Sequence, residues 1–264
     1  MLGLVCCYSG SGNTRLACEY LLRRIPAVKF DLHDVHGHPT PDLDPYGIVG
    51  FATFTDFWGV PQRFIDFVTS LPFQRGSMAF ALNTFGLMSG ATARELRRLV
   101  ESKGFKIIAQ HALHTPESFP PMIIRGMGMV DHPNSRELGR FHGFIGGLKK
   151  NLEQYKQGKL LAPAPRPWNP LYHLLPSRPR TTARQDMGEK YVDEALCTQC
   201  GTCEKGCPYG AIRLDPHPQF DETKCYGCWA CFNHCPTHAI YTRKIRGRGH
   251  YPEPAAPLVE KLSR

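Results

Sequence analysis

Several features that mark other protein classes are missing from this 264-residue sequence. No run of 18 apolar residues occurs, so we expect no membrane-spanning helix. The apolar start, residues 1–8, has no basic leader and stops at Ser9-Gly10, which predicts a first strand and not a signal peptide. No nucleic-acid motif accompanies the net charge of +9. These absences favour a cytoplasmic protein with no membrane span and no nucleic-acid partner.

Cysteine, in contrast, is plentiful and regularly spaced. Eight of the eleven cysteines form two runs of the pattern Cys-x-x-Cys-x-x-Cys-x-x-x-Cys-Pro. In two-cluster bacterial ferredoxins this spacing binds iron-sulfur cubanes, and the fourth cysteine of each run ligates the other cluster. We therefore expect two [4Fe-4S] clusters with crossed ligands: cluster one on Cys197, Cys200, Cys203 and Cys235, and cluster two on Cys225, Cys228, Cys231 and Cys207.

Structural zinc and disulfides are the other two uses of paired cysteines. Zinc takes four ligands per ion, often as two separated pairs, which leaves the third cysteine of each run and the following Cys-Pro unexplained. A disulfide framework is typical of secreted chains. The two runs also form an internal repeat with an offset of 28 residues, which aligns Ala211 with Ala239 and Ile212 with Ile240. Apolar residues there would exclude water from a cluster, so iron-sulfur is the interpretation we favour.

The length suits about two domains. We expect a first domain over residues 1–155, a proline-rich linker over 156–184, the cluster domain over 185–250 and a C-terminal tail over 251–264. Six prolines between positions 163 and 179 predict an extended, semi-rigid linker that limits the separation of the domains and makes electron transfer between them intramolecular. The other cysteines, Cys6, Cys7 and Cys18, are expected to be buried apolar residues. Because exposed clusters of this kind are sensitive to oxygen, we expect a reducing, anaerobic cell.

The first domain alternates strand-like and helix-like stretches. Strands are expected at 2–7, 27–32, 47–54, 77–83 and 106–111, and helices near 15–24, 60–70, 91–103 and 135–155. Five strands alternating with helices predict an α/β fold with a doubly wound parallel sheet. In such sheets ligands bind outside the carboxyl ends of the strands.

The loop after the first expected strand has the composition of a phosphate site. It reads Ser9, Gly10, Ser11, Gly12, Asn13 and Thr14. Glycines let the backbone approach an anion, hydroxyls donate to its oxygens, and the helix that follows points its positive end at it. The loop is neither Gly-x-Gly-x-x-Gly nor a Gly-Lys-Ser/Thr loop, which argues against a dinucleotide or a nucleoside triphosphate. A glycine-serine turn before a helix is also a common cap, so the loop alone does not decide.

Two further loops should reach the same edge of the sheet. Residues 53–59 follow the third strand and residues 83–86 the fourth, and aromatic side chains at loop tips suit stacking on a flat ring.

With these three loops, residues 1 to about 155 resemble a flavodoxin, and the whole chain resembles the flavodoxin-ferredoxin fusion proteins of anaerobic bacteria and archaea. The resemblance implies FMN, with the loop from Ser9 to Thr14 at its phosphate and Phe57 or Trp58 on one face of its ring. The residues that would line the rest of the ring are Thr53, Asn83, Thr84, Phe85 and Gly86.

The charge is unevenly distributed. Residues 185–264 carry ten basic and ten acidic side chains, which leaves 22 basic and 13 acidic ones in residues 1–184. This excess fits an acidic protein partner, or a phosphate-bearing cofactor and negative clusters, better than nucleic acid or anionic lipid. Familiar flavodoxins are acidic around the flavin. A basic surrounding would stabilise the anionic reduced flavin, so a less negative flavin potential is expected.

Four smaller segments have open interpretations. His33, His36 and His38 could hold a metal, although a solvated loop is the simpler reading. His111 and His114 could face the flavin as proton donors or simply pack. The apolar stretch 119–130 either covers the flavin or docks the cluster domain. The basic stretch 243–248 is either a docking patch or a solvated end.

Together these features predict an electron-transfer protein in which electrons pass between two clusters and FMN and on to a redox partner. One alternative is an FMN-dependent reductase of a small organic substrate, which turnover with reduced ferredoxin and a substrate panel would reveal. Another is an iron-sulfur sensor or docking protein without flavin, which the absorption spectrum would reveal.

Overall fold

The first domain is a three-layered α/β fold. The computed structural model of the chain describes residues 1–166 and 181–263. Five parallel strands form one sheet in the order β2-β1-β3-β4-β5. The strands are β1 (Leu2–Cys7), β2 (Lys29–Asp34), β3 (Ile48–Phe54), β4 (Met78–Phe85) and β5 (Lys106–His114). This is the strand order of a flavodoxin-like doubly wound sheet, so the expected fold class is confirmed.

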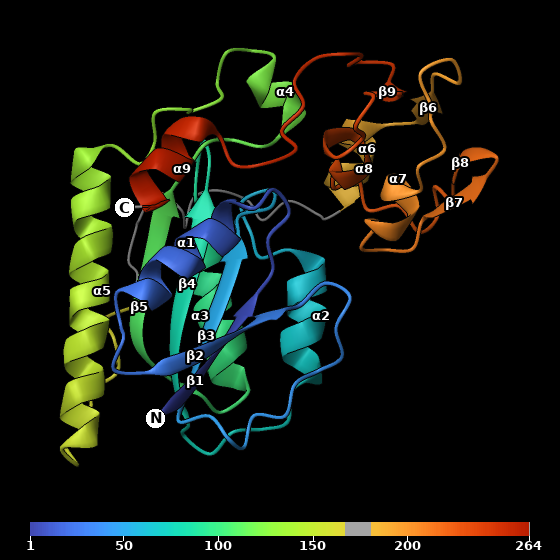
Figure 1. Cartoon of the computed structure of the whole chain (residues 1–264). Coiled ribbons are helices and arrows are strands. Elements are labelled where there is room, and N and C mark those ends of the chain that lie inside the picture. The colour runs from blue at the N-terminus through green and yellow to red at the C-terminus, as the bar shows by residue number, and fades with distance from the viewer. Residues whose placement is uncertain (167–180, 264) are drawn as a thin grey trace.

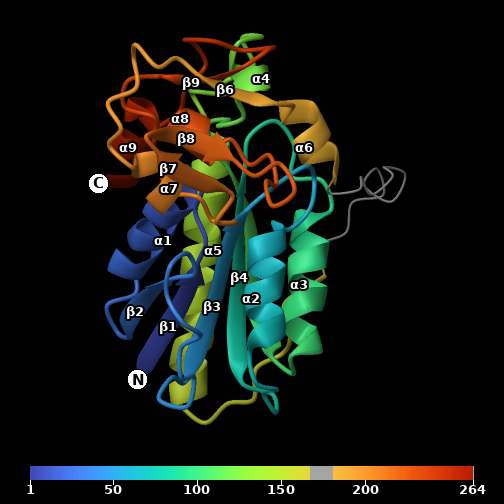
Figure 2. The same cartoon turned by 90° about the vertical axis from the view of Figure 1, so that its right-hand side faces the viewer.

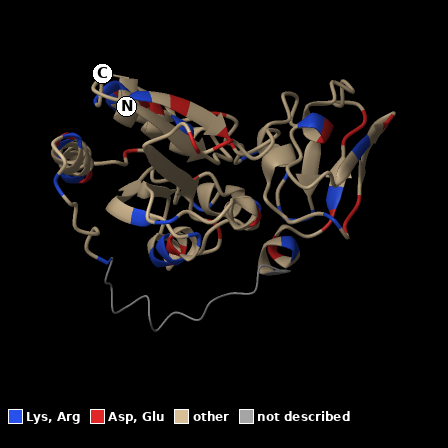
Figure 3. Cartoon of the chain, turned by 90° about the horizontal axis from the view of Figure 1, so that it is seen from below, with Lys and Arg blue, Asp and Glu red and all other residues tan. Residues whose placement is uncertain are grey.

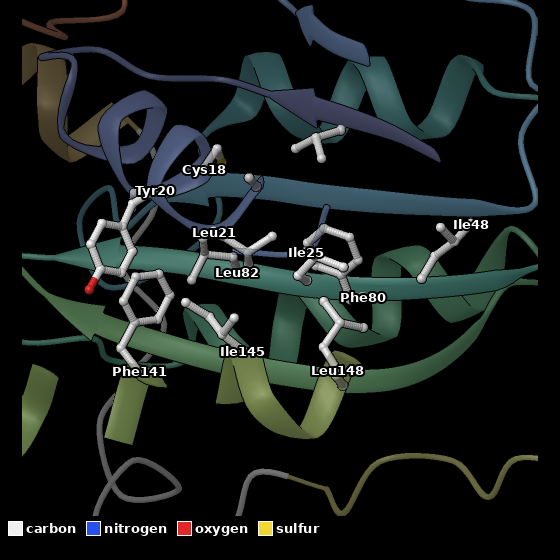
Figure 4. Packing of buried hydrophobic residues seen from close by; sticks show 14 of the residues in the cluster. Cys18, Tyr20, Leu21, Ile25, Ile48, Phe80, Leu82, Phe141, Ile145 and Leu148 are labelled. Carbon is white, nitrogen blue, oxygen red and sulfur yellow. The ribbon is translucent and has the colours of Figure 1, made fainter. Parts of the chain in front are cut away.

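Two pairs of helices cover the two faces of this sheet (Figure 1). One face carries α1 (Asn13–Arg23) and α5 (Ser135–Lys156), and the other carries α2 (Gln62–Ser70) and α3 (Thr92–Ser102). Figure 4 shows Tyr20 and Leu21 of α1 meeting Phe141 and Ile145 of α5 above the strands. All four side chains are at most 4% exposed, so each helix buries one apolar face against the sheet.

Cys6, Cys7 and Cys18 are buried in these two cores, as expected. The expected elements all form, but their ends differ. β2 begins two residues later than predicted, because Val28 still belongs to the turn that follows α1 and its N–H donates to the Ile25 carbonyl. β4 and β5 run further, to Phe85 and His114, because the two strands stay paired up to these residues.

The cluster domain is small and built from short elements. Its strands pair as two antiparallel ribbons, β6 with β9 and β7 with β8. Its elements are α6 (Thr181–Met187), β6 (Lys190–Val192), α7 (Thr202–Lys205), β7 (Ile212–Asp215), β8 (His217–Phe220), α8 (Ala230–Asn233) and β9 (Ile240–Thr242). The domain lies over the carboxyl ends of the first domain's strands, beside the short helix α4 (Pro120–Ile123) (Figure 2).

The two halves of the 28-residue sequence repeat have the same backbone conformation. Helix α7 shifted by 28 residues is helix α8. Gly201 precedes α7 with φ 74°, and Trp229 precedes α8 with φ 63°. After the fourth cysteine of each run, the N–H of Ala211 donates to Cys207 Sγ at 3.3 Å, and the N–H of Ala239 donates to Cys235 Sγ at 3.2 Å. The two halves are therefore one structural unit used twice.

The end of the chain is not a free tail, in contrast to the expectation for residues 251–264. Helix α9 (Ala256–Ser263) returns to the first domain and packs on α1, where Leu258 and Leu262 are fully buried. Arg23 also donates to the Leu262 carbonyl at 2.6 Å. The prediction failed because an apolar face of two leucines is too short to distinguish a docked helix from a loose end.

The basic stretch 243–248 does not form a free end either. Arg243 pairs with Glu189, Lys244 with Asp186 and Arg246 with Asp193, all within the cluster domain. Basic and acidic residues are interspersed in both domains (Figure 3). No helix in the described ranges is long and apolar enough to cross a membrane.

Part of the expected linker lies against the first domain. The N–H of Ala164 donates to the Ile107 carbonyl of β5 at 2.8 Å, and Arg97 donates to the carbonyls of Ala164 and Pro165. The other part, residues 167–180, lies outside the described residues.

Candidate cofactor site between the two domains

A cavity of about 500 Å³ lies between the two domains, at the carboxyl ends of the strands. This volume is within the usual range for small-molecule and cofactor sites. Both domains line it, and the second one contributes Cys228 with its neighbours Gly227, Trp229 and Ala230. The expected cofactor loops and the segment around Cys228 therefore line the same cavity.

The phosphate-like loop forms one wall through Ser9, Gly10 and Ser11. Gly12 caps α1 with φ 88°, a conformation that favours glycine. Among the described residues, the backbone N–H groups from Ser9 to Gly12 have no hydrogen-bond partner. Free N–H groups ahead of a helix are the donor set that binds an anion, so this wall fits a phosphate.

The other half of the loop is structural and does not line the cavity. Asn13 is buried, donates to the Pro116 carbonyl at 3.0 Å and accepts from the Tyr251 hydroxyl at 3.0 Å. The hydroxyls of Thr14 and Thr84 lie 2.8 Å apart and are both buried. A hydroxyl has one O–H to donate. If Thr84 donates to Thr14, the Thr14 O–H stays available for a ligand; if Thr14 donates to Thr84, it does not.

The aromatic loop forms a tight turn that exposes Phe57 and Trp58 to the cavity. Asp56 and Gly59 exchange two backbone hydrogen bonds of 2.9 and 3.0 Å. Phe57 and Trp58 between them have φ 44° and φ 69°. Left-handed backbone costs about 1–2 kcal/mol per non-glycine residue. Such strain gathers at ligand sites, which supports a ring-binding role for this turn.

The remaining expected ring residues mostly support the site from below. Thr53 and Asn83 are fully buried in the sheet, where they face each other in the β3-β4 register. Asn83 Nδ2 donates to Ser89 Oγ at 3.3 Å. Of the expected loop that ends the fourth strand, Gly86 lines the cavity, whereas Asn83, Thr84 and Phe85 do not.

Glu117 ties two cavity loops together. Its carboxylate accepts the backbone N–H groups of Leu87 at 3.0 Å, Ser118 at 2.9 Å and Phe119 at 3.0 Å. A Cβ on Gly86 would lie 2.3 Å from this carboxylate, so the close approach requires glycine. Sequence reasoning missed Glu117, because a single acidic residue in a loop has no pattern.

The cavity is acidic, in contrast to the expectation from net charge. Four carboxylates line it, and no lysine or arginine of the described chain does; the four are Asp34, Asp56, Glu117 and Asp186. Two of these carboxylates are ion-paired, Asp34 with Arg15 and Asp186 with Lys244. The less negative flavin potential expected from the net charge stays a prediction.

The histidines considered as flavin neighbours and those considered as metal ligands lie in different places. His111 stacks on Phe141 and Phe144, and burial together with Arg140 lowers its pKa to about 4. His36 lines the cavity, but His33 stacks on Phe67. Within the described residues, His33, His36 and His38 do not form a metal-binding group.

The stretch 119–130 contacts both the cavity and the cluster domain. Phe119 and Met122 line the cavity. Phe119 also packs edge-to-face on Trp229 of the cluster domain, with ring centroids 6.0 Å apart, and Ile124 joins the same apolar cluster. The Ser118 carbonyl accepts from Asn233 Nδ2 at 3.2 Å.

The second half of the cysteine repeat makes further contacts with the first domain. The Tyr226 hydroxyl donates to Asp56 Oδ2 at 2.7 Å, and His234 Nε2 lies 3.0 Å from the Gly10 carbonyl. Tyr226 stacks on Tyr209 with centroids 4.9 Å apart. Burial raises the pKa of Tyr8, and the adjacent Cys228 and Asp56 raise it further. The wall next to Cys228 is thus a cluster of tyrosines around one carboxylate.

Four cysteines of one expected ligand set lie together. A small enclosed space in the cluster domain is lined by Cys207, Cys225, Cys228 and Cys231. Cys203 and Cys235 pack in an apolar cluster with Ile212 and Ile240, which Cys207 and Cys231 also join. All eleven cysteines, which all lie in the described ranges, are free of disulfides.

The cysteine spacing does not suit zinc. A zinc ion with Zn–S bonds of about 2.3 Å holds its sulfurs roughly 3.8 Å apart. Among the described residues, no three of these cysteines have sulfurs within 4.8 Å of one another.

Comparisons with known proteins agree with this division. Residues 196–239 match the family model of the 4Fe-4S dicluster domain. A search of the curated proteins finds no match.

Solved structures similar to this chain include the flavodoxin of Streptococcus pneumonia TIGR4, which is 14% identical. It covers 57% of this chain and 99% of its own, with a TM-score of 0.44. A flavodoxin from the domain Archaea is 19% identical over 49% of this chain and 94% of its own, with a TM-score of 0.37. The rubredoxin oxygen:oxidoreductase of the anaerobe Desulfovibrio gigas is 12% identical over 58% of this chain and 36% of its own, with a TM-score of 0.42.

The strand order of the sheet, and not these distant likenesses, carries the fold assignment. The chain combines a flavodoxin-like domain with a 4Fe-4S dicluster domain.

Proposed function

We propose that this protein transfers electrons within one molecule, between FMN in the interdomain cavity and two [4Fe-4S] clusters in the second domain. The observation that carries the proposal is that Cys228 and the phosphate-like loop line the same cavity. A cofactor in this cavity and a cluster on Cys228 would be neighbours without any movement of the domains.

The cavity fits FMN in three respects. The free N–H groups of the loop after β1 suit one terminal phosphate, and the strained turn at Phe57 and Trp58 suits the flavin ring. The cluster domain closes the side opposite the loop through Trp229 and Ala230, which excludes water from the ring. When bound, FMN supplies both one-electron and two-electron chemistry.

The two clusters would take the crossed cysteine sets expected from the sequence, with Cys207 joining Cys225, Cys228 and Cys231, and Cys235 joining Cys197, Cys200 and Cys203. The small enclosed space that Cys207 lines together with Cys225, Cys228 and Cys231 supports this arrangement. The N–H groups of Ala211 and Ala239 donate to the two crossing sulfurs and would raise the cluster potentials slightly.

The geometry also favours an order of transfer. Cluster two would lie beside the flavin, because one of its ligands lines the cavity. Cluster one would be the contact for an external redox partner, because none of its ligands lines the cavity, whereas the exposed Cys228 of cluster two does. We place this chemistry in a reducing cytoplasm.

Anaerobic purification tests the cofactors. We expect one FMN and about eight iron and eight sulfide per chain. Ser11→Ala removes a cavity hydroxyl and should weaken FMN binding by about 1.5 to 3 kcal/mol, the range for a hydrogen bond to a charged group. The control Thr40→Ala changes an exposed hydroxyl far from the cavity and should leave affinity unchanged. Adenine-containing flavin, or zinc in place of iron, would contradict the assignment.

Rapid mixing with a protein reductant tests the order. Cys200→Ser should impair flavin reduction by the partner while FMN stays bound, because the external contact is altered. If that variant reduces its flavin at the wild-type rate, electrons enter by another path and the order is wrong.

A further inference from the structure

A second cluster of ligating side chains lies outside the cofactor cavity. It joins His114 at the end of β5, His132 in the following segment and Glu137 in the first turn of α5. One ligand atom from each of the three lies within 4.8 Å of the others. Within the described chain this is the one group of three or more histidine, cysteine or acidic side chains with such spacing.

The three side chains already contact one another. His114 Nδ1 lies 2.9 Å from Glu137 Oε1, and His132 Nδ1 lies 2.7 Å from Glu137 Oε2. Around an ion with bonds of about 2.0–2.1 Å, tetrahedral ligand atoms are roughly 3.3 Å apart. Each histidine nitrogen therefore lies about half an ångström closer to a Glu137 oxygen than it would around an ion, so the carboxylate and the two rings are already gathered at one point.

The surroundings hold two of the three side chains in place. His114 stacks on Phe85 with centroids 4.8 Å apart. The N–H of Asn134 donates to Glu137 Oε2 at 2.8 Å, as part of the capping box of α5. His132 stacks on His114 and is 27% exposed, so an ion at this point would keep one position open to water.

A carboxylate with two imidazoles is a ligand set that suits zinc and related divalent transition metals.

We propose that His114, His132 and Glu137 bind a divalent transition-metal ion, with zinc as its simplest occupant. Residues 115–131 lie between these ligands in sequence and supply Glu117, Ser118 and Phe119, which line the cavity or contact the cluster domain. The ion closes this segment into a loop at its base. The site is independent of FMN and of the clusters, so its role is to fix one wall of the cavity and not to carry electrons.

The test uses the full-length protein with its clusters assembled. Zinc is titrated by calorimetry into the wild type and into Glu137→Gln, His132→Asn and His38→Asn. Gln is also a capping-box residue, so Glu137→Gln removes the anionic ligand while it keeps the helix cap. We expect both ligand variants to lose at least about 10- to 100-fold in affinity. His38→Asn, a histidine outside the cluster, should bind zinc like the wild type.

Anomalous diffraction on both sides of the zinc absorption edge then locates the ion. A peak between His114, His132 and Glu137 supports the site. Zinc only at cluster cysteines, equal affinities in all four proteins, or no zinc binding by the wild type would overturn it and leave a hydrogen-bonded triad. None of these outcomes depends on whether electrons move between the clusters and FMN.

Discussion

The two halves of the cysteine repeat share a backbone but have different surroundings. Positions 198, 201, 204 and 205 of the first half are Thr, Gly, Glu and Lys, whereas the matching positions 226, 229, 232 and 233 are Tyr, Trp, Phe and Asn. The aromatic half makes side-chain contacts with the first domain, whereas the first half only borders the interdomain cavity, through Gly206 and Pro208. Within the described residues, every hydrogen bond from the repeat to the first domain comes from the second half.

Trp229 is the clearest difference between the two halves. It has a left-handed backbone where the first half has glycine, and yet it is only 2% exposed. Its packing against Phe119 and Phe232 offsets the backbone strain. A duplicated unit thus becomes asymmetric through a few side chains, which pack one half against the first domain.

Weakening the packing of helix α9 on the first domain should have the largest effect on stability. Leu258→Ala empties a fully buried position in α9 and should lower the free energy of unfolding by about 2–5 kcal/mol. Val259→Ala, at a neighbouring position that is 39% exposed, should stay within about 0.5 kcal/mol of the wild type. Denaturant unfolding of both variants measures the difference. Equal losses would show that α9 is not docked as described.

Making the second half like the first should come next. Trp229→Gly loses about 3–5 kcal/mol of packing and relieves about 1–2 kcal/mol of backbone strain, for a net loss of about 1–4 kcal/mol. The control Gln199→Gly makes the first half like the second, which has Gly227 at the matching position. It relieves a φ of 57° without loss of core packing and should not destabilise the protein. Cluster-to-flavin electron transfer should slow in Trp229→Gly alone. A rate that is unchanged in that variant would mean that docking of the second half does not control transfer.

Acid should weaken the second half selectively. His250 stacks on Phe232 and His238, and burial followed by the charge of His238 lowers its pKa to about 4. The unfolded chain therefore binds the extra proton first, and stability falls as pH drops from about 6.5 to 4. The loss should not exceed about 1–2 kcal/mol, because the ring is partly exposed. His250→Phe should remove this pH dependence in unfolding titrations, whereas His38→Phe should retain it.

A smaller effect is expected at the contact between Tyr226 and Asp56. Tyr226→Phe removes one hydrogen bond to a carboxylate, so the interface should weaken by about 1–2 kcal/mol and electron transfer to the flavin should slow. Tyr241→Phe makes the same chemical change in β9 and should have no effect on the rate. If both variants transfer electrons equally fast, the contact does not position cluster two.

Cutting the chain between the domains should have the smallest effect. From composition, a cut between positions 163 and 180 would make transfer slower, dependent on concentration and sensitive to salt. The direct contacts and the docked α9 lead us to expect an unchanged, concentration-independent rate, because the pieces remain associated. The same cut combined with Leu258→Ala should restore concentration dependence. Rapid-mixing absorbance at several protein concentrations separates these outcomes.

The sequence by itself determined the features that depend on local pattern. Cysteine spacing identified the cluster domain, because the ligands of each run are close along the chain. Apolar alternation and the small-residue loop predicted the parallel sheet and the loop at its edge, since period and turn chemistry are local properties. A comparison of the two repeat halves would also have predicted the docking face, from Tyr226 and Trp229 against Thr198 and Gly201.

Only the tertiary structure decided which side chains share the cavity. Asn13, Thr53 and Asn83 support the site instead of lining it, whereas Glu117 and Asp186 line it from positions that no motif marks. Net charge misjudged the cavity because it sums over the whole surface, while a cofactor responds to the charges nearest to it. The return of α9 and the meeting of His114 with Glu137 likewise join residues far apart in sequence, and such contacts follow from packing and not from local pattern.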